Sequence, residues 1–483
     1  MFPYIRKRCL AVIIGIRIFM KSDSNPLLIL PVENQVRELD SKLLFGCFAV
    51  EKGFEVLIGS RPYVNFAMTK LRPGIFVAKS MRRRSALMLN IIKNLGHRIV
   101  AWDEESLVRF QSKEYNHWRF SNETFAPIEH LFAWGKDDAR MFKGYEGLGR
   151  TAVHITGNPR MDLLREEFRS VFDREVNEIK EKYGSFVLIN TNFSFVNSYV
   201  SDLNLLIGGD RGAQSVVSRT GEGMSTEFAR GMFVHQQQIA ASFASLISKI
   251  GFEKRDIKFI LRPHPSENHS FWREVVSELP NVEMIHEGNV VPWILASTCL
   301  LHNGCTTAVE AAVLGKPAIT YQKVRSESFD YHLPNGLSLV AENESQAIDL
   351  IQKLVQESRH QDLPVNKGLL SEHLCASNGL FASERILGIL ASRIDLSHRD
   401  SGFSWTNMAS AYLMGTARTT LKKINSFRKG HRNSKAYHDH RFPRITSAQL
   451  QKKVATLDKT LGRFAFVKIH QFSENLFMMK RDK

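Results

Sequence analysis

Cysteine is scarce in this chain, and long hydrophobic runs are absent. Its 483 residues include 5 cysteines, none of them in a CxxC pair. This usage argues against a disulfide scaffold and a zinc site, and it favours a cytoplasmic protein with reduced cysteines. No run of 18 apolar residues occurs, so we expect no transmembrane helix. The apolar segment near the N-terminus has no cleavage site, which argues against a signal peptide.

Acidic residues are scarce only near the C-terminus. Residues 401–483 contain 17 Lys and Arg against 4 Asp and Glu, whereas the first 400 residues contain 48 against 45. The near-neutral body argues against a nucleic-acid-binding protein. We predict that the basic extension forms amphipathic helices and loops rather than a third sheet, with an anionic membrane surface as its partner. A disordered, solvated extension is the alternative.

Short apolar runs alternate with helical patterns from residue 27 onward. Runs of four to six apolar residues, each followed by a turn and a stretch with helical spacing, are typical of parallel strands joined by helices. The alternation stops at the charged stretch Met161–Lys182, for which we predict one long helix, and then resumes. The sequence therefore predicts an α/β fold with two Rossmann-like, doubly wound lobes that face each other across a cleft.

The same pattern sets the boundaries of the predicted segments. They are an N-terminal extension (1–25), an N-terminal lobe (26–165), a linker helix (166–184), a C-terminal lobe (185–370), a crossover helix (371–400) and the basic extension (401–483). Strands are predicted at Leu27–Leu30, Phe54–Ile58, Arg98–Trp102, Leu131–Trp134 and Ala152–Ile155 in the first lobe, and at Phe186–Asn190, Lys258–Leu261, Val282–Ile285, Cys299–Leu301 and Ala318–Tyr321 in the second.

The loops that follow the second lobe's strands carry polar residues, and ligands of open parallel sheets bind at this end of the strands. A turn with glycine leads from one strand to two threonines at a helix start, where free N–H groups form an anion site. His264 lies between two prolines, which fix the direction of its imidazole. A capped helix and a hydrogen-bonded loop histidine are the alternatives. The candidates are Asn190, Asn192, Arg262, His264, Pro265, Asn303, Gly304, Thr306, Thr307 and Glu310.

Three consecutive carboxylates follow a strand of the first lobe, at Asp103, Glu104 and Glu105. We expect their mutual repulsion to raise the pKa of at least one of them, as suits a general base. A solvated acidic helix start is the alternative. The other candidates for this wall of the cleft are Glu33, Arg37, Asn158 and Arg160.

These loops resemble those of the two-lobed GT-B glycosyltransferases, and more narrowly those of a bacterial family of surface carbohydrate biosynthesis proteins. The similar stretches keep their order over about residues 27–325 and leave 400–483 uncovered. The ending with Glu310 and Gly315-Lys-Pro317 is shared with the sugar-nucleotide epimerases. The stretches are Pro31-Val-Glu…Arg37-Glu-Leu-Asp40, Thr156-Gly-Asn-Pro-Arg-Met-Asp162, Leu188-Ile-Asn-Thr-Asn-Phe193, Arg262-Pro-His-Pro265 and Gly304…Thr307…Glu310-Ala…Gly315-Lys-Pro317.

A second likeness is to bacterial sialyltransferases and Kdo transferases, which use CMP-activated sugars. His264-Pro265 matches their His-Pro motif. Glu104-Glu105-Ser106 only approaches their acidic motif, because Ser106 stands in place of a glycine. This departure leaves the identity of the catalytic base open among Asp103, Glu104 and Glu105.

The resemblance implies a cytoplasmic, peripheral membrane glycosyltransferase of capsule, O-antigen or lipopolysaccharide assembly. It would transfer a Kdo-like or nonulosonate-like sugar from a nucleotide donor, preferably a CMP-sugar, to a glycan or lipid-linked glycan. The donor phosphate would lie between His264 and the Gly304–Thr307 turn, with Glu310 at the ribose, and no metal or further cofactor is implied. The alternatives are a CDP-polyol phosphotransferase of teichoic-acid type, a sugar-nucleotide 2-epimerase, and a non-enzymatic basic protein.

Overall fold

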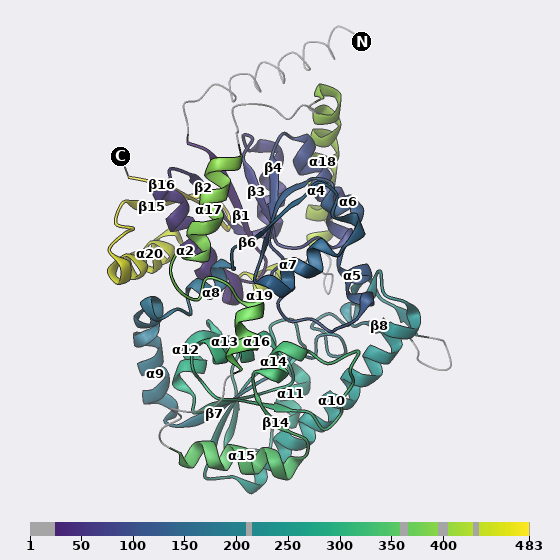
Figure 1. Ribbon diagram of the computed structural model, residues 1–483, viewed down its shortest axis with the longest axis vertical. Helices are drawn as coiled ribbons and strands as arrows, with labels where there is room; N and C mark the ends of the chain where they lie inside the picture. Colours follow the sequence, from purple (N-terminus) through teal and green to yellow (C-terminus); the bar gives the residue numbers. More distant parts are fainter. Residues whose placement is uncertain (1–24, 209–214, 358–365, 395–403, 428–433, 483) are drawn as a thin grey trace.

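A computed structural model describes residues 25–208, 215–357, 366–394, 404–427 and 434–482. It consists of two lobes stacked along the long axis of the molecule, each built on one sheet (Figure 1). The predicted N-terminal extension, apart from Asn25, lies outside the described residues. No helix among the described residues has the length and hydropathy needed to cross a membrane.

The first lobe alternates strands and helices, and its parallel strands come from residues 27–155. Its elements are β1 (Leu27–Val32), α2 (Gln35–Glu51), β2 (Glu55–Ser60), α3 (Arg61–Ala67), η1 (Met68–Lys70), β3 (Ile75–Ala78), η2 (Arg83–Ser85), α4 (Ala86–Asn94), β4 (Arg98–Ala101), α5 (Lys113–Arg119), α6 (Asn122–Phe125), β5 (Ile128–Ala133), α7 (Lys136–Lys143), η3 (Glu146–Leu148), β6 (Ala152–Ile155), α8 (Pro159–Asp162), η4 (Glu166–Phe172) and α9 (Asp173–Tyr183).

The second lobe repeats this alternation. Its elements are β7 (Phe186–Asn190), η5 (Ser201–Leu203), β8 (Leu206–Ile207), β9 (Val216–Val217), η7 (Arg219–Gly221), α10 (Thr226–Glu253), β10 (Lys258–Arg262), α11 (His269–Val275), β11 (Val282–Met284), α12 (Val290–Ala296), β12 (Cys299–His302), α13 (Thr306–Val313), β13 (Ala318–Tyr321), α14 (His332–Gly336), β14 (Leu339–Ala341) and α15 (Glu344–Gln356). The rest of the chain forms α16 (Lys367–His373), α17 (Ala382–Arg393), α18 (Trp405–Ser426), α19 (Lys435–Arg441), α20 (Ser447–Leu461), β15 (Val467–Ser473) and β16 (Leu476–Arg481).

Both main sheets have the strand order of doubly wound folds. The parallel strands of the first sheet run β2-β1-β3-β4-β5-β6, and those of the second run β11-β10-β7-β12-β13-β14. The order therefore reverses between β1 and β3 in one lobe and between β7 and β12 in the other, which are the points where such sheets bind ligands. The prediction of two doubly wound lobes is confirmed.

Each sheet buries both of its faces, as parallel sheets do. In β1 the side chains of Leu28 and Leu30 pack in the cluster that contains α2, whereas those of Leu27 and Ile29 pack in the cluster that contains α4. The first of these clusters continues without a break into the second lobe, through residues such as Phe168 and Trp293. The lobes therefore share part of their core.

The predicted helix Met161–Lys182 is wrong, because the chain breaks into α8, η4 and α9. The break coincides with a contact between Asp162 and a distant part of the chain. The buried Asp162 accepts hydrogen bonds from the backbone N–H groups of Ala382 and Ser383, at 2.8 and 2.9 Å, and from the Ser383 hydroxyl. This contact anchors the start of α17, which packs on α2 and α8 of the first lobe. The returning chain thus stops the helix at Asp162.

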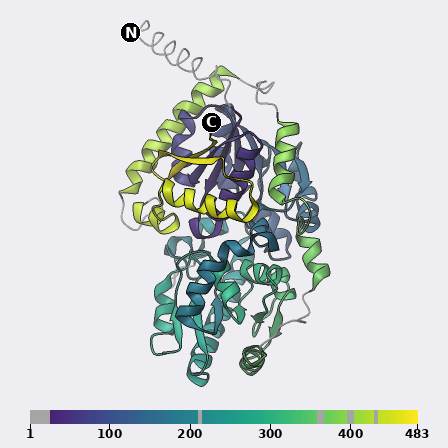
Figure 2. The ribbon, with the colours of Figure 1, turned by 90° about the vertical axis from the view of Figure 1, so that its left-hand side faces the viewer.

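The described residues of the C-terminal extension form helices, as the sequence predicts, and also a β-hairpin that the sequence analysis missed. Strand β16 pairs antiparallel with β2, and β15 pairs with β16, so the hairpin extends the first sheet (Figure 2). Its turn places Asn475 in the left-handed region, at φ 53°. The strands described in the extension therefore join the first sheet rather than forming a third one, and they cover the edge that β2 would otherwise expose.

Candidate functional site

A cleft of about 550 Å³ lies between the lobes, and its walls come from both of them and from the C-terminal extension. It runs along the carboxyl ends of the strands at the two points where the strand order reverses. Among the predicted site residues, those that line it are Glu33, Arg37, Glu105, Arg160, Asn190, Asn192, Arg262, His264, Pro265, Thr306 and Thr307. The predicted site residues that are not part of the lining are Asp103, Glu104, Asn158, Asn303, Gly304 and Glu310.

The second-lobe wall presents a helix start whose donors are not capped by a side chain. Helix α13 begins at Thr306, and its N-cap residue Cys305 makes no capping hydrogen bond. Free N–H groups at a helix start favour an anion. Beside it, the Oδ1 atom of the buried Asn190 has no hydrogen-bond partner among the described residues. Both features leave polar atoms of the cleft available to a ligand.

A donor group lies beside each ring nitrogen of His264. The Ser266 N–H donates to Nδ1 at 3.1 Å, and Arg37 Nη1 lies 2.9 Å from Nε2 across the cleft. Burial and the charge of Arg37 lower the pKa of His264 well below its ordinary value, so the ring is neutral near pH 7 and carries one proton. A neutral imidazole can accept at one nitrogen only, so when Nδ1 accepts from Ser266 the Nε2 proton faces the Arg37 donor. Two donors then face each other across the cleft, and a phosphate oxygen that accepts from both would relieve this contact.

The sequence analysis missed Glu267, which fixes the His264 loop. Its carboxylate is fully buried and accepts from the His264 N–H and the Phe193 N–H, both at 3.1 Å, and from the Thr191 hydroxyl at 2.8 Å. The Trp272 indole donates to its other oxygen at 2.8 Å. Glu267 thus joins the loops after β7 and β10. Its position three residues after His264 is the sequence feature that could have identified Glu267 as a partner of this loop.

The side chain of Arg262 has a different partner from the predicted phosphate. Its guanidinium donates to the carbonyl oxygens of Glu287 and Gly288, at 2.8 and 3.0 Å, and lies 4.8 Å from the ring centre of Trp293. Burial lowers its pKa to about 9. Arg262 therefore ties down the loop before α12 and shapes the cleft wall.

Two further predicted residues join the lobes, Arg160 in the cleft lining and Glu310 outside it. Arg160 Nη2 and Glu310 Oε1 form an ion pair at 2.5 Å, and both side chains are largely buried. Glu310 Oε2 has no partner among the described residues, so the predicted ribose contact stays a hypothesis. Asn158 caps α8 by accepting from the Arg160 N–H at 3.0 Å. Gly304 has φ 84°, and a Cβ there would lie 3.0 Å from Tyr331, so this turn requires glycine.

The acidic loop does not behave as a group of repelling carboxylates. Asp103 is fully buried in an ion pair with Arg119, and Glu104 pairs with Lys42 at 3.1 Å. Only Glu105 faces the cleft, where Arg119 Nη1 lies 2.8 Å from its carboxylate. Partial burial acts to raise the pKa of Glu105, but Arg119, Lys79 and Arg82 outweigh it and hold the pKa well below its usual range. The expectation of a raised pKa is therefore wrong for Glu105, because cations surround the loop.

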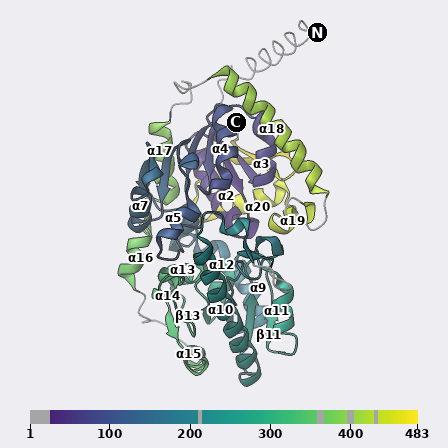
Figure 3. The ribbon, with the colours of Figure 1, turned by 90° about the vertical axis from the view of Figure 1, so that its right-hand side faces the viewer.

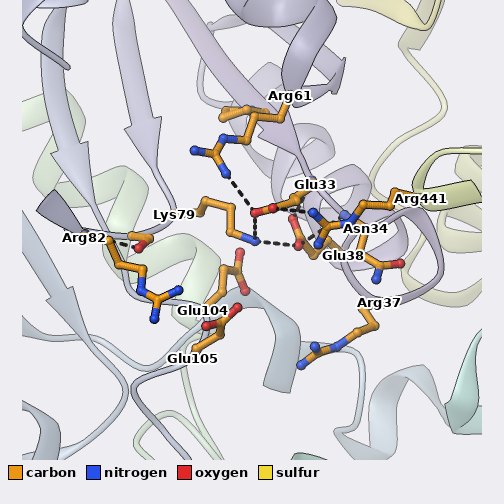
Figure 4. A network of polar contacts seen from close by, with 12 residues as sticks. Glu33, Asn34, Arg37, Glu38, Arg61, Lys79, Arg82, Glu104, Glu105 and Arg441 are labelled. Carbon is orange, nitrogen blue, oxygen red and sulfur yellow. Dashed lines mark hydrogen bonds and ion pairs between the residues drawn. The ribbon is translucent and has the colours of Figure 1, made fainter. Parts of the chain in front are cut away.

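Glu33 takes part in a network that fills the first-lobe end of the cleft (Figure 4). Its carboxylate pairs with Lys79 at 2.6 Å, with Arg61 at 3.0 Å and with Arg441 of α19 at 2.6 Å. Burial raises its pKa, but these three cations outweigh burial and hold the pKa well below the usual range. Glu38 adds a second carboxylate against Lys79, at 3.0 Å. Glu33 thus neutralises cations of the wall and anchors the C-terminal extension.

The cleft carries a large excess of positive charge. Its lining contains thirteen Lys or Arg residues and two Asp or Glu residues. Among the described residues, Arg37, Arg82 and Arg84 have no carboxylate within ion-pair distance. In the view of Figure 4, Arg37 and Arg82 lie on either side of Glu105. The cationic lining residues are Arg37, Arg61, Lys79, Arg82, Arg84, Arg109, Arg119, Arg160, Arg219, Arg262, Arg418, Lys422 and Arg441.

This excess points to an anionic ligand. Burial and the charges of Arg84 and Arg119 lower the pKa of Arg82, and burial and Arg160 lower that of Arg37. Such crowding of like charges is relieved by a bound anion. Among the described residues, no three His, Cys, Asp or Glu side chains are grouped as metal ligands. The cleft residues themselves can hold one or more phosphate groups.

We expect the free energy of unfolding to fall steeply below pH 6.5, because two buried histidines are neutral in the fold. Burial lowers the pKa of His302 to about 3 and that of His97 to about 4. The unfolded chain binds protons at these sites below about pH 6.5 and the folded chain does not, so stability is present above that pH and is lost as pH falls. Each site contributes about 1.4 kcal/mol per pH unit.

Urea unfolding at pH 7, 6 and 5 measures this slope. His302→Gln removes one titrating site, so its slope should be shallower by up to one proton. The matched change His470→Gln, at an exposed position of β15, should leave the slope unchanged. Equal slopes in the two variants would contradict the assignment.

No protein-family model and no curated protein sequence matches this chain. Solved structures do share its architecture. The UDP-GlcNAc 2-epimerase of Methanocaldococcus jannaschii, in complex with UDP-GlcNAc and UDP, is 13% identical over 76% of this chain and 99% of its own, with a TM-score of 0.48. The UDP-GlcNAc 2-epimerase from Neisseria meningitidis, bound to UDP-GlcNAc, is 13% identical over 76% and 100%, with a TM-score of 0.46. The wall teichoic acid polymerase TagF is 10% identical over 76% and 87%, with a TM-score of 0.45. At these low values, the activity of this chain has to follow from its own site.

Proposed function

We propose that this chain is a glycosyltransferase that uses a nucleotide-activated sugar in the synthesis of a cell-surface polysaccharide. The observation that carries the proposal is the pairing of the two cleft walls. A neutral histidine and an uncapped helix start lie on the second-lobe wall, and Arg37 of the first lobe reaches that histidine across the cleft. Glu105 faces the same cleft from the first lobe. Glu105 and His264 both line this cleft.

In the proposed reaction, the acceptor hydroxyl attacks the anomeric carbon of the donor sugar. The bond between that carbon and the nucleotide phosphate breaks, and its electron pair leaves with the phosphate oxygen. His264, Arg37 and the N–H groups at the start of α13 stabilise the negative charge on the leaving phosphate. Glu105 takes the acceptor proton. Its lowered pKa is compatible with this role, because the attacking oxygen becomes strongly acidic as it bonds to carbon.

The distribution of charge favours a transferase over a sugar-nucleotide 2-epimerase. The reaction of an epimerase has one substrate and needs no acceptor. The cations Arg82, Arg84 and Arg418 lie on first-lobe and extension walls of the same cleft, where they are available to a second, anionic substrate. We infer that a CMP-sugar is the donor, and that a CDP-polyol phosphotransferase is the alternative transferase.

A binding screen of CMP, CDP, UDP, GDP and dTDP by calorimetry tests this proposal. We expect CMP to bind, and His264→Ala to weaken that binding at least tenfold, because the variant removes a donor to the phosphate. The matched change His470→Ala, at an exposed position of β15, should leave the affinity unchanged. UDP binding without CMP binding would favour a hexosyltransferase or an epimerase, and the need for an acceptor would separate these. Binding of no nucleotide at all would refute the proposal.

A further inference from the structure

Helix α18 exposes an apolar face where a surface helix would ordinarily be charged. The exposed fractions of Leu413 and Leu421 are 69% and 62%. Phe427, the residue after the helix, is 87% exposed. Ile424 and Trp405 are also exposed. The helix sequence contains no Asp or Glu. Surface helices of globular proteins direct polar residues to solvent and apolar residues to the core, so this pattern requires another explanation.

The opposite face of α18 is firmly packed, which fixes the direction of the exposed one. Met408, Ala411 and Gly415 are buried, and the helix contacts α3, η1 and α4 along the outside of the first lobe (Figure 3). A Cβ at Gly415 would lie 2.9 Å from the Thr69 side chain and 3.5 Å from the Ile91 side chain, so the α18 backbone packs closely on these side chains. The apolar side chains therefore point away from the lobe.

The helix carries three cations, and one of them, Lys423, is exposed to solvent. The other two, Arg418 and Lys422, line the cleft. They are accompanied there by Arg61 of α3 and by Arg219 of η7. The helix thus has a largely apolar outer side, on which Lys423 is also exposed, and a cationic inner edge that belongs to the proposed active-site cleft.

We propose that α18 docks on a lipid bilayer that carries anionic headgroups, with its outer face in the interfacial region and the cleft opening beside it. An exposed apolar stripe flanked by aromatic residues and lysines is the pattern of helices that lie in a membrane interface. The cationic edge complements anionic headgroups. The inference deepens the proposed function, on which it rests for one consequence only: an acceptor held in the bilayer would present its charged headgroup to Arg418.

A second copy of this chain is the competing occupant of the face. Charge argues against it, because residues 401–483 contain 17 Lys and Arg against 4 Asp and Glu. Pairing two copies through α18 would bring these basic extensions together. An anionic bilayer neutralises the same charges, so the membrane is the better partner.

Co-sedimentation of the full chain with vesicles tests the proposal. The vesicles contain phosphatidylcholine alone or with 30% phosphatidylglycerol. We expect binding to the anionic vesicles, weakened at least tenfold in Leu413→Ser/Leu421→Ser/Ile424→Ser. The matched control is Phe252→Ser/Phe271→Ser/Val340→Ser, which removes exposed apolar side chains of the second lobe and should not change binding. Circular dichroism and nucleotide affinity show whether the variants are folded.

The outcomes separate docking from catalysis. Equal vesicle binding by the wild type and the α18 variant, or no binding by either, would overturn the proposal. A wild-type dimer that the α18 variant converts to a monomer in light scattering would assign the face to a second copy instead. Vesicle binding without any nucleotide binding would leave docking intact and refute the proposed function. Nucleotide binding without vesicle binding would leave the proposed function intact and refute membrane docking.

Discussion

Glu105→Gln should lower the rate of sugar transfer by about 10²–10⁴-fold, the usual contribution of a positioned general base. The amide keeps the size of the side chain and can still contact Arg119, but it cannot accept the acceptor proton. Nucleotide affinity should change less than threefold, because the phosphate is expected on the opposite wall, at His264 and α13. The test measures kcat of the wild type and the variant with the donor that the binding screen identifies. The dissociation constant of its nucleotide is measured for both proteins as well.

The pH profile supplies an independent test of Glu105. Its neighbouring cations hold its pKa well below the usual range, so the carboxylate stays ionised and its protonation should cause no loss of kcat between pH 7 and pH 5. Glu123→Gln is the matched control, since Glu123 is exposed in α6 outside the cleft lining. Wild-type activity in Glu105→Gln, or an equal loss in Glu123→Gln, would exclude Glu105 as the base.

The strands that the sequence predicts are those with a clear apolar run and a turn on each side. Strand β3 was missed although its four residues, Ile75–Ala78, are apolar and follow the turn residues Pro73-Gly74. The hairpin β15–β16 was missed for a physical reason. The strands carry lysines and stand in a basic segment, and what orders them is pairing with β2, more than 400 residues earlier in the chain. Local patterns do not reveal such a partner.

The site residues divide in the same way, into those that local sequence patterns reveal and those whose partners are distant in the chain. Loops that continue a predicted strand brought His264, Thr306 and Asn190 to the cleft as expected. Lys79 was missed together with its strand, although it pairs with Glu33 and Glu38. Arg441 was missed because its partner, Glu33, is 408 residues away.

The acidic loop shows what such distant partners change. Three adjacent carboxylates suggest mutual repulsion when only their neighbours in sequence are considered. In the fold, Arg119 is brought to Asp103 and Glu105, and Lys42 is brought to Glu104. A charge pattern in sequence therefore predicts a site, but the sign of its pKa shifts depends on residues from other elements.

Arg119→Met should lower the free energy of unfolding by about 3–5 kcal/mol, which is the usual cost of leaving one member of a buried ion pair without its partner. Arg119 and Asp103 have side chains 1% and 0% exposed. Asp103 also accepts from the Glu105 N–H at 3.0 Å, and its carbonyl accepts from the Trp134 indole at 2.7 Å. The lost arginine therefore leaves a buried charge at the centre of the loop that presents Glu105. Urea unfolding at pH 7 gives the value.

A double variant separates the lost charge partner from lost packing. Asp103→Asn/Arg119→Met removes both charges and keeps an acceptor for the Glu105 N–H, so it should be more stable than Arg119→Met alone. Arg140→Met is the matched control, because Arg140 pairs with Asp137 and Glu372 at a side-chain exposure of 67%, and exposed pairs contribute less than about 1 kcal/mol. If the double variant were less stable than Arg119→Met, the loss would come from packing of the methylene groups. If both arginine variants lost the same small amount, water would have to reach the Asp103 carboxylate, and the loop would hold Glu105 less firmly than its role as a base requires.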